Sequence, residues 1–145
     1  MESIGSLLDH AARKYGEKTF VFFKDEEISF REMNDLANKV ANAFLSEGMK
    51  KSDRVAIMLT NRPEYLSVWF GLNRIGASMV PINTVFTTYE TEYIIDNSES
   101  SVGVAGAEYY QTVEEAWAKC PLLEKMILLD SDKKPGNGGT FQRFC

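Results

Sequence analysis

The chain has 145 residues, a length suited to one ordinary domain, with 16 Lys and Arg against 21 Asp and Glu and a formal net charge of −5. Hydrophobic residues make up 44% and charged residues 26%, which is typical of a soluble globular domain that needs no disulfide or metal to fold. The acidic balance argues against nucleic-acid binding, which depends on clustered Lys and Arg. One His and two Cys cannot supply the four ligands of a structural zinc site.

The early part of the chain lacks the pattern of a secretory signal. Asp9 and His10 fall where a signal peptide would be apolar. The densest apolar run, residues 68–72, is far shorter than the ~20 residues of a membrane-spanning helix. Cys120 and Cys145 lie far apart in the sequence and are interpreted as unpaired thiols of a reducing compartment. We therefore expect a cytoplasmic protein without a transmembrane segment.

The chain begins with a predicted helix and hairpin. Apolar residues recur at helical spacing between Ser3, a candidate N-cap, and Gly16, which follows the helix. Two apolar runs, 19–23 and 28–30, flank a polar turn at 24–27 and predict two antiparallel strands.

A second helix is predicted directly after the hairpin. Ser29 and Glu32 have the spacing of a capping box, in which each side chain satisfies a free backbone N–H of the other residue. The helix is expected to end at Gly48. Its apolar stripe consists of Met33, Leu36, Ala37, Val40, Ala41 and Phe44.

The middle of the chain predicts four buried parallel strands. Short apolar runs begin at residues 55, 78, 102 and 126, and these intervals accommodate the ~12-residue helical crossover that a parallel pair requires. The gaps carry helical patterns, with predicted capping boxes at Asn61 with Glu64 and at Thr87 with Glu90, and a further helix at 109–119. The predicted fold class is α/β: a layered, mostly parallel sheet with crossover helices, preceded by a helix and a short hairpin.

Two segments are expected: residues 1–130 as the α/β portion, and residues 131–145 as a linker or mobile tail rich in Gly and Pro. The glycines at 136–139 could suggest a phosphate loop. Such a loop needs a Lys-Ser/Thr pair at the start of a helix, whereas Lys133 and Lys134 precede the glycines. We interpret this stretch as a linker.

The reactive side chains of this sequence occur singly and are not arranged as a catalytic group. His10 lies on the polar flank of the first predicted helix, and no G-x-S-x-G nucleophile motif occurs. The three acids at 25–27 are interpreted as a solvated turn, and Cys120, with Lys119 as its one basic neighbour, as an inert thiol. The aromatic residues at 65, 69 and 70 could suggest a ligand stack, but their helical spacing favours the core or a surface that another domain covers. The sequence therefore contains no constellation that could itself perform a reaction.

A sheet of this class binds ligands at the carboxyl ends of its strands. Those ends are small and polar in this sequence, and Asp130 is the one strong acid among them. They are compatible with lining a pocket but offer no base or nucleophile.

An ordered series of motifs resembles the N-terminal region of the AMP-forming acyl-CoA synthetases, members of the adenylate-forming, AMP-binding superfamily. The resemblance covers residues 3–130 and is nearest to fatty acyl and carnitine-type CoA ligases. The family has Gly before Asp-Arg-Val, whereas this chain has Ser52. The motifs are Ser29-Phe30-Arg31-Glu32-Met33-Asn34, Ala41-Asn42-Ala43-Phe44, Ser52-Asp53-Arg54-Val55-Ala56-Ile57-Met58-Leu59, Asn61-Arg62-Pro63-Glu64-Tyr65, Trp69-Phe70-Gly71-Leu72, Ile75-Gly76-Ala77 and Val80-Pro81-Ile82-Asn83.

The resemblance implies a ligase of fatty acid metabolism that activates a carboxylic acid with ATP and Mg²⁺, releases pyrophosphate and transfers the acyl group to CoA. The family's phosphate loop, nucleotide contacts and catalytic lysine match nothing in this chain. Some members place basic residues after the strand corresponding to 102–105 to contact CoA; here that stretch is Glu108 to Gln111, and the role is not carried over. The resemblance leaves a scaffold role, with Asn83 and Thr84 as candidate pocket-wall residues and with no catalytic, cofactor-binding or metal-binding residue.

Two hypotheses follow. The first is an N-terminal fragment of an acid–CoA ligase, inactive and without bound cofactor on its own, whose partners are the remainder of the ligase chain or a second copy through exposed apolar surface. The alternative is a non-catalytic α/β module for ligand binding or interaction that keeps the scaffold.

Overall fold

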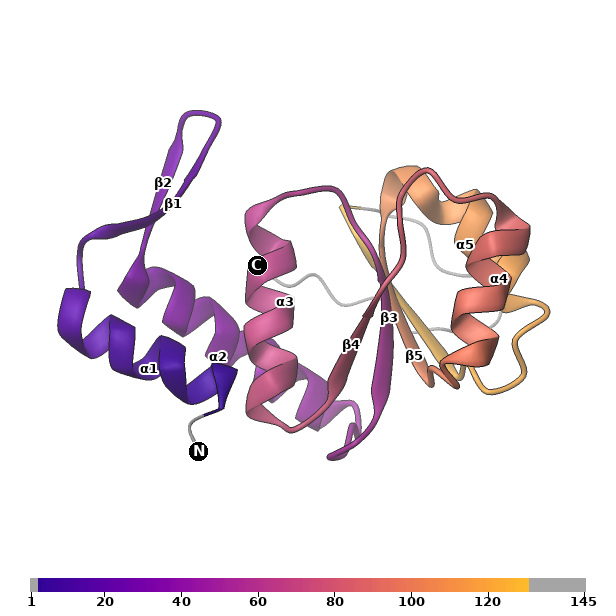
Figure 1. Cartoon of the computed structure of the whole chain (residues 1–145), viewed down its shortest axis with the longest axis horizontal. Coiled ribbons are helices and arrows are strands. Elements are labelled where there is room, and N and C mark those ends of the chain that lie inside the picture. The colour runs from indigo at the N-terminus through magenta and orange to yellow at the C-terminus, as the bar shows by residue number, and fades with distance from the viewer. Residues whose placement is uncertain (1–2, 131–145) are drawn as a thin grey trace. The chain divides into compact units, whose positions relative to one another are not determined.

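The computed structural model describes residues 3–130, drawn in colour in Figure 1. These residues divide into two compact units. The first contains residues 3–52 and 61–77, and the second contains residues 53–60 and 78–130.

The first unit consists of three helices and a two-stranded antiparallel hairpin. Its elements are α1 (Ile4–Tyr15), β1 (Thr19–Phe23), β2 (Glu26–Ser29), α2 (Phe30–Ser46) and α3 (Pro63–Arg74).

The predicted helix boundaries in this unit are confirmed where side chains cap the backbone. Ser3 caps α1 by accepting the Ser6 N–H, and Gly16 follows the helix with a positive φ. Ser29 and Glu32 form the predicted capping box of α2. The Ser29 backbone N–H and hydroxyl both donate to the Glu32 carboxylate, which holds the pKa of Glu32 below its ordinary value.

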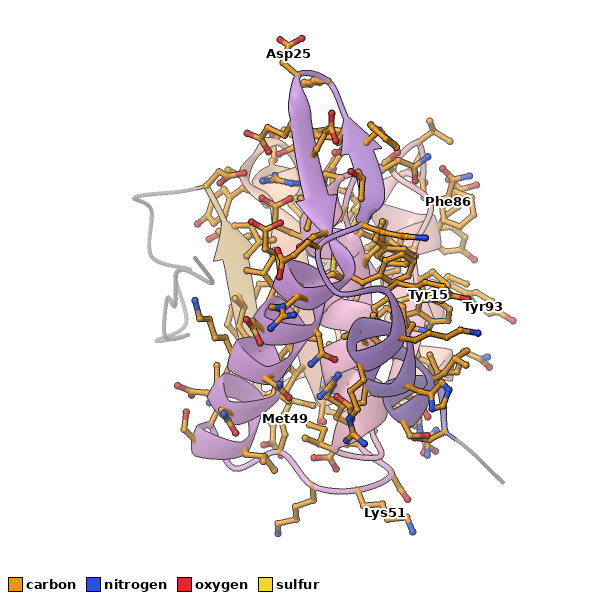
Figure 2. The ribbon with its side chains drawn as sticks, turned by 90° about the vertical axis from the view of Figure 1, so that its left-hand side faces the viewer. Tyr15, Asp25, Met49, Lys51, Phe86 and Tyr93 are labelled. Atoms are coloured by element: carbon orange, nitrogen blue, oxygen red, sulfur yellow. The ribbon has the colours of Figure 1, made fainter. Side chains whose placement is uncertain are left out.

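The hairpin differs in detail from the prediction. Its turn is Lys24 and Asp25 alone, because Lys24 adopts a positive φ of 53° and the chain reverses within two residues. Glu26 therefore already belongs to β2, and Phe30 begins α2 instead of ending the strand. Asp25 lies at the tip of the hairpin, as Figure 2 shows.

The core of the first unit is built where α1, α2 and α3 meet. Leu8, Met33, Ala37 and Phe70 form one buried cluster. Gly71 on α3 allows α2 and α3 to approach each other closely, because a Cβ at position 71 would lie 2.8 Å from Val40 Cγ1 on α2. The predicted core role of the aromatic residues of α3 is confirmed for Phe70 and for Trp69, which packs against the same cluster.

Arg74 joins the three helices by polar contacts. Its Nη2 atom lies 3.0 Å from an Asp9 carboxylate oxygen on α1 and donates to Asn34 Oδ1 on α2 at 2.6 Å. Nη1 donates to Asn38, one turn further along α2. The side chain is 14% exposed, so these bonds are largely shielded from water.

The second unit is a four-stranded sheet with helices, and its strands are all parallel in the order β4-β3-β5-β6. The predicted fold class and the four predicted strands are therefore confirmed. Its elements are β3 (Arg54–Met58), β4 (Ser78–Pro81), α4 (Thr88–Asn97), β5 (Val102–Gly106), the short 3₁₀ helix η1 (Ala107–Tyr109), α5 (Tyr110–Trp117) and β6 (Lys125–Leu129).

Helices α4 and α5 lie against the same face of this sheet (Figure 1). Burial of apolar side chains is the main stabilising contribution here. The Trp117 indole N–H also donates to the Leu123 carbonyl, which satisfies the one polar atom of that side chain. The buried cluster between helices and sheet consists of Ala56, Met58, Ile82, Ile95, Ala105, Val113, Ala116, Trp117, Cys120, Leu123, Met126 and Leu128.

Of the three predicted capping boxes, two are present and one is wrong. Thr87 and Glu90 cap α4 as expected. At α3, however, the N-cap is Arg62 and no side chain caps the helix. Pro63 at the first helical position holds Arg62 extended, and the Arg62 guanidinium binds the Glu64 carboxylate, which therefore does not reach Asn61.

The last helix is shorter than predicted. The stretch expected as one helix at 109–119 is divided into η1 and α5, and α5 ends at Trp117. None of the helices within residues 3–130 is both long enough and apolar enough to cross a membrane. The predicted linker, 131–145, lies outside the described residues.

Candidate functional site

The carboxyl ends of the four parallel strands lie at one edge of the sheet. Thr60 follows β3, Asn83 follows β4, Glu108 follows β5 and Asp130 follows β6, and all four side chains are exposed. This edge is where a sheet of this class binds small molecules.

Asn83 and Thr84, the candidate pocket-wall residues, begin the loop that leads into α4. The Asn83 side-chain oxygen accepts the N–H of Val85 at 3.2 Å, and its carbonyl accepts the N–H of Phe86 at 3.0 Å. These two bonds form a turn of the kind that Asn favours. Asn83 therefore shapes this loop, and Thr84 is half-buried beside it.

The order of the strands identifies the position at this edge where ligands are most often bound. The chain passes from β3 to β4 on one side and then returns to β5 on the other, so the direction of winding reverses between β3 and β5. In open α/β sheets the crevice at such a reversal is the usual binding position. Thr60 and the segment Gly106–Glu108 belong to this position, and the sequence patterns alone did not distinguish them because they do not give the strand order.

Glu108 dominates the chemistry at this reversal. Its side chain folds back over Gly106, so that a Cβ at Gly106 would lie 2.5 Å from a carboxylate oxygen of Glu108. The absence of a side chain at Gly106 is what leaves room for this carboxylate. A negative charge here repels a phosphate group, as does Asp130 at the end of β6.

The neighbouring aromatic side chains are engaged in packing. Tyr109 and Tyr110 are half-buried against the core of the second unit. The Tyr110 hydroxyl donates to the Glu114 carboxylate one turn later, which raises the pKa of the tyrosine above its ordinary value. Tyr110 thus stays protonated at neutral pH and acts as a hydrogen-bond donor.

The remaining candidate residues are not brought together. His10 is exposed on α1 in the first unit. Cys120 is a free, buried thiol of the second unit; burial raises its pKa, and the nearby charges of Asp96 and Glu92 raise it further. Within residues 3–130, no group of three or more His, Cys, Asp and Glu is arranged to hold a metal ion.

The residues at the edge therefore fit a wall better than a reaction centre. Thr60, Asn83 and Thr84 provide small polar groups, whereas Glu108 and Asp130 provide carboxylates that disfavour bound phosphates. These side chains do not fit the triphosphate of ATP or the phosphates of CoA, and no chemical step is assigned to them.

Comparison with known proteins gives a consistent relationship. Residues 8–142 match the family model described as AMP-binding enzyme. The chain is 34% identical over 139 residues to crotonobetaine/carnitine–CoA ligase of Citrobacter koseri, which covers 92% of this chain and 27% of the relative. It thus spans about a quarter of the length of that curated relative.

Solved structures agree with this relationship. The N-terminal domain of FACL13 from Mycobacterium tuberculosis superposes with a TM-score of 0.78 at 26% identity, over 97% of this chain and 33% of that one. The long-chain-fatty-acid–CoA ligase FadD1 of Archaeoglobus fulgidus superposes with a TM-score of 0.83 at 26% identity, over 90% of this chain and 28% of that one. The parallel sheet, the helices and the family match together show that this chain belongs to the AMP-binding enzyme family.

Proposed function

We propose that this chain is the N-terminal portion of an ATP-dependent carboxylic acid–CoA ligase and that it serves as a scaffold. In that role its sheet and helices support the nucleotide and acyl pockets. The observation that carries the proposal is the extent of the match, which takes in 92% of this chain but 27% of a curated CoA ligase.

The side chains of the carboxyl edge support the scaffold role. Forming an acyl adenylate requires groups that stabilise the negative charge that develops on the phosphates. The edge instead carries Glu108 and Asp130, together with the small polar residues Thr60 and Asn83. We infer that ATP, Mg²⁺ and CoA are held by other parts of the ligase and that this portion alone does not form acyl adenylates.

The substrate of the proposed ligase is a carboxylic acid. The matched relatives include one named for crotonobetaine and carnitine and others named for long-chain fatty acids. Within this chain, Asn83 and Thr84 are the proposed contribution to the wall of the acyl or nucleotide pocket, with Thr60 beside them at the same edge of the sheet.

The experiment that tests the proposal replaces the matched region of the Citrobacter koseri ligase with this chain. A scaffold role predicts a folded chimera that catalyses ATP–pyrophosphate exchange dependent on the carboxylic acid. The control is the same ligase with the matched region deleted, which is expected to be inactive. A chimera that folds cooperatively and shows no exchange contradicts the proposal and favours a non-catalytic interaction module.

A further inference from the structure

Helix α4 is held differently at its two ends. Its C-terminal end is tied to β3, because the Arg54 guanidinium donates to the Ser98 carbonyl at 2.7 Å and lies 3.1 Å from the Glu99 carboxylate. The Ser101 N–H also donates to the Arg54 carbonyl at 3.1 Å, and Ile95 is buried in the core cluster of the second unit. Arg54 begins β3, so this end of α4 is anchored at the edge of the sheet opposite to the candidate site.

The N-terminal end of α4, which follows β4 at the carboxyl edge, has weaker ties. The capping box of Thr87 and Glu90 satisfies backbone groups of α4 itself and does not attach the helix to the sheet. Within the described part of the chain, the side-chain bond from the first turn (residues 88–91) to another element is that of Thr88 to Glu115 on α5, at 2.9 Å and exposed. Competition with water keeps the net contribution of such a bond small.

Thr91 is the residue of this first turn that packs inward. Its side chain is 0% exposed, and among the residues that the structure describes its Oγ1 atom has no hydrogen-bond partner. A buried hydroxyl without a partner destabilises the packed position, because water would satisfy the same group if it were exposed. Movement of the first turn away from the sheet would hydrate this hydroxyl, which lowers the free-energy cost of the movement.

The loop before α4 can follow such a movement. Ile82 is buried, and its N–H donates to a carbonyl of β3 at 2.8 Å, which fixes the chain where it leaves β4. The bonds of the Asn83 turn lie within the loop itself, and Phe86 is half-buried against the core cluster. The segment between the fixed points Ile82 and Ile95 therefore contains Asn83 and Thr84, the candidate pocket-wall residues.

We propose that residues 83–91 form a movable wall, which opens about the anchored C-terminal end of α4 and admits the carboxylic acid to the carboxyl edge. The movement is argued from contacts within this chain, whereas the identity of the ligand rests on the proposed function. Residues 83–91 include no Lys or Arg, but they include Val85, Phe86 and Tyr89. The acyl part of the substrate therefore suits this wall better than a phosphate does.

The first test is backbone ¹⁵N relaxation dispersion, measured by NMR on the 145-residue chain. Opening of the movable wall on the microsecond-to-millisecond timescale predicts dispersion at the amides of residues 83–91. Ile57 and Val104, in the central strands β3 and β5, serve as the rigid reference and are expected to give flat profiles. Flat profiles throughout residues 83–91 would overturn the proposal.

A matched pair of variants tests whether the buried hydroxyl favours the open position. Thr91→Val keeps the shape of the side chain and removes the hydroxyl, and it is expected to lower the population of the open position about tenfold. Thr91→Ser keeps the hydroxyl and is expected to retain the dispersion at residues 83–91. Equal open populations in Thr91→Val and in the natural chain contradict the proposal.

The entry of the substrate is tested in the chimera of the Citrobacter koseri ligase that carries this chain. Only molecules with an open wall admit the carboxylic acid, so Thr91→Val should lower its association rate constant about tenfold in stopped-flow fluorescence, and Thr91→Ser should not. An active chimera with equal rate constants overturns the entry role and leaves the proposed function standing. A folded chimera that neither binds the acid nor catalyses pyrophosphate exchange contradicts the proposed function, and it overturns substrate entry through the wall.

Discussion

Ser52 is the one noted departure from the family motif, and its backbone conformation in the structure is strained. Ser52 has a φ of 75°, in the left-handed region that glycine adopts without strain. Its side chain is exposed, and its N–H donates to the Gly76 carbonyl at 2.8 Å, a bond that glycine would also make. Replacing Ser52 with glycine therefore changes the backbone strain and little else.

The Ser52→Gly variant is expected to be more stable than the natural chain. A left-handed conformation costs an L-residue roughly 1–2 kcal/mol, and the greater freedom of glycine in the unfolded chain offsets part of the gain. The net gain is about 1 kcal/mol, which corresponds to a rise in Tm of about 3–4 °C for a chain of this size. The measurement is thermal unfolding followed by circular dichroism.

Two controls test the reasoning. Ser52→Ala keeps the Cβ and is expected to leave Tm nearly unchanged. Gly48 has a φ of 85°, and a Cβ there would meet nothing within 4 Å. Gly48→Ala should therefore lower stability by about 1 kcal/mol through the backbone alone. If Ser52→Gly is no more stable than Ser52→Ala, backbone strain at position 52 does not lower the stability of the chain.

Three further predictions concern the packing and capping of the helices. Gly71→Ala should destabilise the chain by about 1–2 kcal/mol in urea unfolding, since the new methyl group on α3 would press on Val40 of α2. Unchanged stability would show that α2 and α3 move apart without cost. Arg74→Met should cost about 1–3 kcal/mol by removing the bonds to α1 and α2, and an equally stable variant would show that these bonds contribute nothing net. The Thr87 N–H and hydroxyl lower the pKa of Glu90 in the folded chain. The ionised Glu90 carboxylate therefore contributes to stability above its ordinary pKa, and this contribution is lost as the pH falls through the pKa of the folded state. Glu90→Gln should therefore be less stable than the natural chain at pH 7 and differ less at pH 3; an equal difference at both would contradict this linkage.

The sequence predicts those elements whose signals are local. The capping boxes at Ser29 and Thr87 depend on a hydroxyl and a carboxylate three residues apart, and both are present. The same spacing at Asn61 fails because Pro63 and the Arg62–Glu64 pair determine the start of α3. A nearby proline can thus override a capping pattern, and its restriction on the preceding residue is the signal that could have corrected the prediction.

Less of the candidate site than of the fold could be predicted from the sequence. Strand periodicity indicates four strands and their carboxyl ends, which brings Asn83 and Thr84 to attention. It does not give the order β4-β3-β5-β6, which arises from long-range pairing and places the reversal between β3 and β5. The fold of Glu108 over Gly106 is likewise a tertiary arrangement.

The central claim is that this chain contributes framework to adenylation while the reacting groups lie elsewhere in the ligase. The most direct test is carboxylate-dependent ATP–pyrophosphate exchange by the purified 145-residue chain, with the intact Citrobacter koseri ligase as the positive control. The claim predicts exchange no faster than in the protein-free reaction across a panel of carnitine-type and fatty acids. Exchange that rises in proportion to the concentration of this chain would contradict it.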